Sequence, residues 1–142
     1  MLLGILPECG GRRYALDPMA VTNPIHIIKT RMPREQLASL LGHPFSDYVK
    51  FVVDVERRIL AVGGELHVDA EAEMLERGSS QSALWGGNYL PGRGPSGCIQ
   101  YTSMVNLRPS QGNSTMEVGN PALREKIRGI VFELLGEGES VA

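Results

Sequence analysis

Residues 48–69, YVKFVVDVERRILAVGGELHVD, form the longest apolar-rich stretch of the chain, and their pattern decides the fold. The spacing of Tyr48, Val52 and Val55 fits a helical stripe, but apolar residues also alternate here as they do in a strand. The density of β-branched residues favours strands. The pair Gly63-Gly64 would weaken a helix by about 1 kcal/mol for each glycine. We therefore predict a β-hairpin.

The hydrophobic pattern also predicts the register of this hairpin. If Glu56-Arg57 forms the turn, Val53 lies opposite Leu60 and Phe51 lies opposite Val62. Shifting the pairing by one residue would mix apolar and polar side chains on each face. Glu and Arg do not suit a type I′ turn, so a longer, irregular loop is the alternative. The expected core face holds Val49, Phe51, Val53, Val55, Leu60, Val62, Leu66 and Val68, and the other face holds Lys50, Asp54, Glu56, Glu65, His67 and Asp69 with Val52, Ile59 and Ala61.

Local signals predict the elements around the hairpin. Residues 25–29 (IHIIK) form a short strand, and a helix follows that starts at Pro33 and stops at Gly42. After the hairpin, Asp69 is a suitable N-cap for a helix over 70–77.

The C-terminal half of the chain is predicted to contain two strands and a helix. In the strand over 83–90, Gly86-Gly87 indicates a bulge or a close approach of another backbone. A second strand covers 98–107. The last helix is capped by Asn120, and Pro121 takes its first position.

Together these elements predict a single α+β domain over 25–136, in the order β-α-β-β-α-β-β-α. Its sheet is mostly antiparallel, and its helices lie largely on one face. Residues 1–24 are expected to be a disordered or loosely ordered extension, or 1–18 an upstream start with Met19 as the true beginning. Residues 137–142 are expected to be a frayed tail.

Composition narrows the classes of function. The net charge is −2, so no basic field favours nucleic acid. Cys9 and Cys98 make no disulfide framework, which suggests a cytoplasmic protein. No apolar run approaches the roughly 20 residues of a membrane span, and the apolar patch near the N-terminus precedes its arginines, unlike a signal peptide.

Glu65, His67 and Asp69 alternate along the predicted second strand of the hairpin, so all three would point the same way. Such a group can bind a metal or form a histidine base oriented by an acid. Because Asp69 already serves as an N-cap, we favour ordinary sheet-surface residues over both and predict no metal site. If the chain has a catalytic pair, Glu65 and His67 are the candidates. The sequence specifies no cofactor.

The turn over 108–113 (RPSQGN) offers a guanidinium, a hydroxyl, two amides and glycine backbone, which can bind a carboxylate or a phosphate. The slightly favoured alternative is a turn that satisfies its own backbone, with Arg108 paired to a glutamate. Trp85 is either a core residue, which we favour, or one wall of a pocket beside Gly86-Gly87. The candidate ligand-binding residues are Trp85, Asn88, Arg108, Ser110, Gln111 and Asn113.

Five segments in a fixed order, VVDVE, AVGGELH, LWG, NLRPSQGN and NPALREKI, resemble a family of small prokaryotic proteins of unknown function. The resemblance runs from about Ile25 to Leu135. It implies a cytoplasmic stand-alone domain and supplies no activity.

The sequence therefore supports two hypotheses about function. The first is a small cytosolic ligand-binding or enzymatic domain, with a polar site between the GGELHVD corner (63–69) and the RPSQGN turn, and with a small anion as a possible ligand. The second is a protein–protein interaction module, in the form of a homodimer with no catalytic site. Binding to nucleic acid or to a membrane is not expected.

Overall fold

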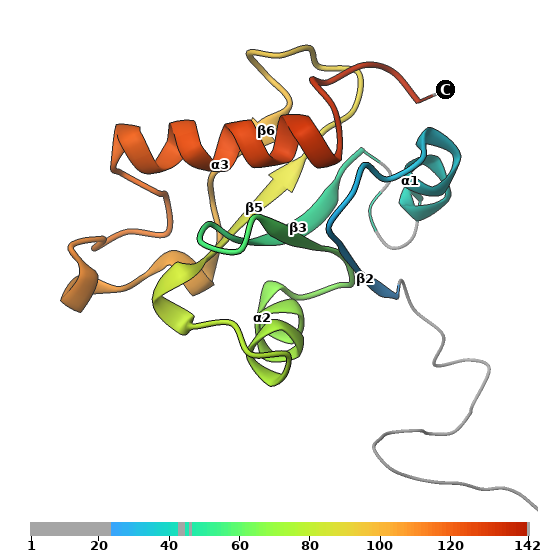
Figure 1. The fold of residues 1–142 in the computed structure, drawn as a ribbon. Coiled ribbons are helices and arrows are strands. Elements are labelled where there is room, and N and C mark those ends of the chain that lie inside the picture. Colours follow the sequence, from blue (N-terminus) through green and yellow to red (C-terminus); the bar gives the residue numbers. More distant parts are fainter. Residues whose placement is uncertain (1–23, 43–44, 46, 142) are drawn as a thin grey trace, which may run out of the picture.

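The computed structural model describes residues 24–42, 45 and 47–141. The predicted extension over 1–24 lies outside these residues, apart from Pro24. In the described part of the chain, strands and helices follow one another in the predicted order (Figure 1). The elements are β2 (Ile25–Ile28), α1 (Arg34–Leu40), β3 (Val49–Asp54), β4 (Ile59–Gly63), α2 (His67–Glu76), β5 (Leu84–Tyr89), β6 (Ile99–Gln100) and α3 (Pro121–Leu134), with 3-10 turns η2 (Gln81–Ala83), η3 (Met104–Asn106) and η4 (Pro109–Gln111).

The strands form one antiparallel sheet in the order β2-β4-β3-β5-β6. The predicted hairpin register is confirmed, because Phe51 pairs with Val62 and Val53 pairs with Leu60. The connection is the longer loop, in which Arg58 has a positive φ of 56°. Asp54 holds this loop, since its Oδ1 accepts hydrogen bonds from two backbone N–H groups of the loop at 2.9 and 2.8 Å.

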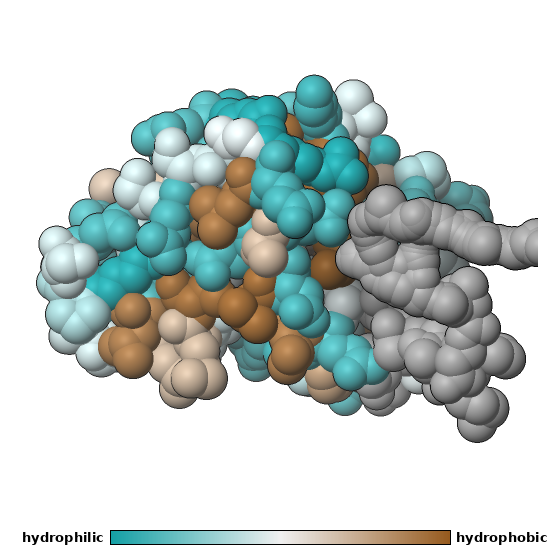
Figure 2. Space-filling view, turned by 90° about the horizontal axis from the view of Figure 1, so that it is seen from below, coloured by the Kyte–Doolittle hydropathy of each residue, from teal (hydrophilic) through white to brown (hydrophobic). Residues whose placement is uncertain are grey.

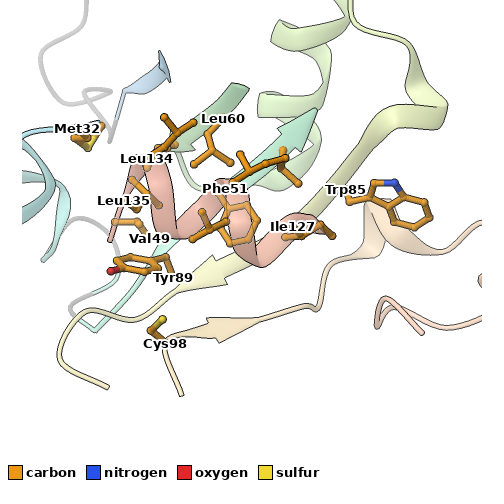
Figure 3. Packing of buried hydrophobic residues seen from close by; sticks show 14 of the residues in the cluster. Met32, Val49, Phe51, Leu60, Trp85, Tyr89, Cys98, Ile127, Leu134 and Leu135 are labelled. Atoms are coloured by element: carbon orange, nitrogen blue, oxygen red, sulfur yellow. The ribbon is translucent and has the colours of Figure 1, made fainter. Parts of the chain in front are cut away.

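Helices cover both faces of the sheet (Figure 1). On one face, α1 and α3 pack on six of the eight side chains that the alternation predicts for the core, whereas the other two, Leu66 and Val68, are exposed. Figure 3 shows Ile127 and Leu134 of α3 lying over Phe51 and Leu60. On the other face, α2 packs on Val52, Ile59, Ala61 and Leu84 through Ala70 and Met74. Two of the three helices in the described part of the chain thus share a face, and α2 buries the apolar residues of the face predicted to be polar.

The predicted strand over 98–107 is too long. Only Ile99 and Gln100 pair with β5, and the chain then leaves the sheet to form η3. The alternation of apolar residues arises because Ile99 and Tyr101 pack against the core, whereas Leu107 is exposed. The apolar alternation typical of a strand therefore extends past Gln100, although the residues after it make no strand pairing with β5.

Hydrogen bonds fix the start of α3 and the segment that follows the helix. Asn120 is the predicted N-cap, and its Oδ1 accepts from Ala122 N at 2.8 Å and from Leu123 N at 3.2 Å. Within the described residues, the segment that the sequence predicts as a frayed tail makes hydrogen bonds to the rest of the chain. Gly138 N donates to the Tyr89 hydroxyl at 2.9 Å, and Gly138 O accepts from Gly92 N at 3.0 Å. Within the described residues, no helix is long and apolar enough to cross a membrane.

Candidate functional site

A cavity of about 620 Å³ opens between α2, β3, β5 and the segment that leads into η3. We call it the α2–β5 cavity. Its polar lining residues are Lys50, His67, Glu71, Asn88, Thr102 and Ser103, and its apolar lining residues are Leu66, Val68, Met104 and Val105. Of these ten, His67 and Asn88 are among the residues that the sequence predicts for a site.

His67 reaches the cavity as the first residue of α2, not as a strand residue. Gly63 and Gly64 have φ values of 104° and 82°, which suit glycine and turn the chain out of β4 before residue 65. The predicted alternation of Glu65, His67 and Asp69 on one strand face is therefore wrong. Asp69 is also no N-cap, because it lies in the first turn of the helix.

Glu65 and His67 consequently lie in different places. Glu65 is exposed and lines a separate hollow together with Asp69 and Glu73 of α2, whereas His67 lines the α2–β5 cavity. The geometry that suggested a joint acid–base pair is absent.

The imidazole of His67 has a defined tautomer. Its Nε2 lies 2.7 Å from the carbonyl oxygen of Gly87, and because a carbonyl only accepts, Nε2 carries the proton and Nδ1 is left as an acceptor. Burial lowers the pKa of His67 to about 4, and the charge of Lys50 acts in the same direction. His67 is therefore neutral at neutral pH.

Lys50 and Asn88 lie directly opposite each other on β3 and β5, so both side chains emerge on the α2 face. The Lys50 ammonium lies 5.1 Å from the centroid of the Phe45 ring and 5.9 Å from that of the Tyr48 ring. Among the described residues it forms no ion pair with a carboxylate, and burial lowers its pKa. Asn88 Nδ2 donates to a neighbouring strand residue, Gln100, at 3.0 Å.

Glu71 follows His67 by one helical turn and is only 9% exposed. Its Oε2 lies 3.6 Å from Nη2 of Arg108, which is itself buried. This distance makes an ion pair but not a hydrogen bond. Lys50 and Glu71 are site residues that sequence reasoning does not select. Lys50 is placed on the polar face of the predicted hairpin, but nothing in the sequence shows that α2 folds over it.

Arg108 is fully engaged within the protein. Its Nε donates to Val105 O at 2.9 Å, its Nη1 donates to Gln81 O at 2.7 Å, and its Nη2 donates to Leu84 O. The guanidinium also stacks 4.5 Å from the centroid of the Trp85 ring. The structure thus agrees with the alternative in which Arg108 pairs with a glutamate, and it leaves no free guanidinium edge for an anion.

The other predicted ligand-binding residues lie apart from His67 and Asn88. Trp85, Gln111 and Asn113 line a second hollow near the start of α3. The amide of Asn113 is saturated, because Nδ2 donates to three carbonyl oxygens at 2.7–2.9 Å and Oδ1 accepts from Gly119 N at 2.9 Å. Ser110 is exposed. The single site predicted between the GGELHVD corner and the RPSQGN turn is therefore divided in two, with Arg108 and Trp85 packed between the parts.

The metal-ligating side chains of the described residues form no group of three or more that could hold an ion. The polar side chains that line the α2–β5 cavity are instead one amine, one imidazole, one carboxylate, one amide and two hydroxyls. Such a set suits hydrogen bonding and charge pairing with an organic molecule.

Comparison with known protein families gives one match. A model of a family described as proteins of unknown function, DUF5674, matches residues 26–134. The chain belongs to the DUF5674 family. The DUF5674 match covers the sheet from the second residue of β2 onward, all three helices and every residue that lines the α2–β5 cavity. It agrees with the resemblance to an uncharacterised family. Searches of curated proteins and of solved structures found no significant match.

Proposed function

We propose that this protein binds a small amphipathic molecule with an anionic group in the α2–β5 cavity. One observation carries the proposal. Lys50 brings a positive charge into a largely apolar cavity, and among the described residues no carboxylate pairs with it. A partly buried charge of this kind is unfavourable unless it is compensated. The anionic group of a ligand would compensate it.

The rim of the cavity is apolar, which supports the proposal that most of the ligand is apolar. Leu66, Val68 and Met104 are 55%, 53% and 76% exposed, although each lines the cavity. Figure 2 views the molecule from the side of α2 and shows a band of hydrophobic residues crossing this face between hydrophilic ones. Hydrophobic walls with a few convergent polar groups are typical of small-molecule sites.

Straight-chain carboxylates of four to eight carbons are suitable probes. We expect them to shift the amide resonances of α2 and β5 in NMR titrations, with dissociation constants of about 1–10 mM for ligands this small. Lys50→Met should weaken binding about tenfold, and Lys50→Arg should retain most of it, because the positive charge persists. Lys126→Met is the matched control, since Lys126 is exposed on α3 at the opposite face. Equal affinity of the Lys50→Met variant and the wild type would contradict the proposal.

A homodimer is the competing function, because a second copy of the chain could bury the same exposed rim. Sedimentation equilibrium separates the two. We expect a monomer at about 50 μM protein, a concentration at which a specific dimer of micromolar affinity would be populated. A dimer that dissociates on Met104→Gln would favour the interaction module instead.

A further inference from the structure

Two buried side-chain acceptors lack hydrogen bonds in the part of the chain that the structure describes, and both belong to residues of the α2–β5 cavity. They are Oε2 of Glu71 and Oδ1 of Asn88. Buried polar atoms are nearly always paired in folded proteins, so each of these two atoms needs a donor. The donor can come from the protein itself or from a ligand in the cavity.

The acceptor on Asn88 has a possible donor within the protein. Lys50 is the cross-strand partner of Asn88, and its ammonium carries three N–H groups that a change of rotamer can direct to the amide. Among the described residues no donor is hydrogen-bonded to Oε2 of Glu71, including Thr102 and Ser103, which also line the cavity. Glu71 is nine-tenths buried, and Arg108, its ion-pair partner, is held at 3.6 Å by bonds to three backbone carbonyls. Glu71 is therefore the acceptor that depends on a ligand.

The charge balance around Glu71 indicates what kind of donor fits. Arg108 already compensates the carboxylate, so a second cation beside Glu71 would also face the guanidinium. A neutral hydroxyl or amide N–H can donate to Oε2 without that repulsion.

The helix separates the two polar ends of the cavity. His67 bonds to Gly87, the neighbour of Asn88, so the first turn of α2 lies near the Lys50 end. Glu71 comes four residues later, about 6 Å further along the helix axis. A carboxylate at Lys50 and a donor at Glu71 would therefore belong to opposite ends of one short molecule.

We infer that the ligand is a short-chain carboxylic acid with a hydroxyl or amide group at its far end. The inference rests on the proposed function, because it takes the carboxylate to lie at Lys50. The apolar chain then lies along Leu66, Val68 and Met104, and the terminal donor satisfies Glu71.

The test compares three matched series on the wild-type protein: unbranched carboxylates of four to eight carbons, the same acids with a terminal hydroxyl, and the same acids with a terminal amine. At one chain length, we expect the hydroxy acid to bind about tenfold more tightly than the plain acid, the gain typical of a hydrogen bond to a charged group. The amino acid should bind more weakly than the hydroxy acid, because Arg108 lies beside Glu71. In the Glu71→Gln variant the ratio between the affinities for the hydroxy acid and for the plain acid should shrink.

The outcomes separate this inference from the proposed function. If the plain acids bind in a Lys50-dependent way and the hydroxyl adds nothing at any length, the inference is overturned and the proposed function stands. If neither series binds, both are overturned. Because the comparison between ligands uses the wild-type protein, it decides the question even if Glu71→Gln does not fold.

Discussion

The side chain of Asn106 takes the place of a β-strand beside Gly86. Its Oδ1 accepts from Gly86 N at 2.8 Å, and its Nδ2 donates to Gly86 O at 2.9 Å. β6 pairs only with Asn88 and Tyr89, so the edge of β5 at Gly86 would otherwise have no partner in the sheet. The same Nδ2 also lies 3.1 Å from Met116 O, which ties the loop after η4 to the sheet. One fully buried amide thus joins β5 to the loop that follows η4.

Asn106→Ala is expected to lower the free energy of unfolding by about 3 kcal/mol, because it leaves both backbone groups of Gly86 unpaired and removes one of the two hydrogen bonds to the carbonyl of Met116. Urea denaturation measures the change. Ser110→Ala is the control, since Ser110 is exposed, and it should change stability by less than about 0.5 kcal/mol. A loss below about 1 kcal/mol for Asn106→Ala would show that water replaces the amide.

The buried Arg108–Glu71 ion pair should be sensitive to the loss of one partner. Arg108→Met should destabilise the protein by about 3–5 kcal/mol, because it leaves the buried carboxylate of Glu71 without a cation and removes the hydrogen bonds from Arg108 to three backbone carbonyls. Adding Glu71→Gln removes the stranded charge, so the double variant should be more stable than Arg108→Met alone. Chemical denaturation of the single and double variants tests the order. Arg77→Met, which breaks an exposed pair with Glu73, should have no measurable effect.

His67 predicts a pH dependence of stability. Its pKa falls from 6.5 to about 4 on folding, so the unfolded chain binds a proton more readily than the folded protein between these values. The contribution of His67 to the free energy of unfolding is therefore constant above pH 6.5, falls as the pH drops towards 4, and is level below that. The total change is roughly 3 kcal/mol, at about 1.4 kcal/mol for each pH unit.

His67→Gln isolates this effect. The glutamine amide can donate to Gly87 O as Nε2 of His67 does, but it does not titrate. Relative to the variant, the wild type should lose roughly 3 kcal/mol of unfolding free energy as the pH falls from 6.5 to 4. A difference that does not vary with pH would mean that His67 titrates normally.

Two glycines of the fold should respond in opposite directions to alanine. A Cβ on Gly87 would lie 2.6 Å from both Gln100 O and the Phe51 ring, so Gly87→Ala should cost about 1–3 kcal/mol. A Cβ on Gly129 in α3 meets nothing within 4 Å, so Gly129→Ala should stabilise the helix by about 1 kcal/mol. Thermal denaturation measures both. Equal melting temperatures for the two variants would contradict the close packing at Gly87.

Local sequence patterns predict several features of this fold correctly. Alternation of apolar residues in β3 and β4 predicts their register, because a shift by one residue would expose the core face. Asn120 followed by proline predicts the start of α3, since capping depends on neighbouring residues alone. Gly86-Gly87 predicts a close approach of other atoms, and Ser103, Gln100 and Phe51 supply it without a bulge in the β3–β5 register.

Other predictions fail where distant residues decide the outcome. Leu66 and Val68 continue the alternation of β4 but are exposed, because two glycines with positive φ turn the chain into α2 first. The segment over 98–107 has a strand pattern but only two residues in the sheet, because Asn106 supplies the pairing of β5 from the side. In both cases the same alternation of apolar residues is compatible with a strand and with another backbone conformation.

The sequence by itself determined the order of the elements, the hairpin register, the cap of the last helix and the membership of an uncharacterised family, because each depends on neighbouring residues or on motifs in order. Only the tertiary structure decided which polar residues share a site. It separates Glu65 from His67, encloses Arg108 among backbone carbonyls, and brings Lys50, Glu71 and Asn88 to one cavity. The physical reason is that burial and pairing depend on how α2 packs across the sheet, and that packing joins residues far apart in the chain.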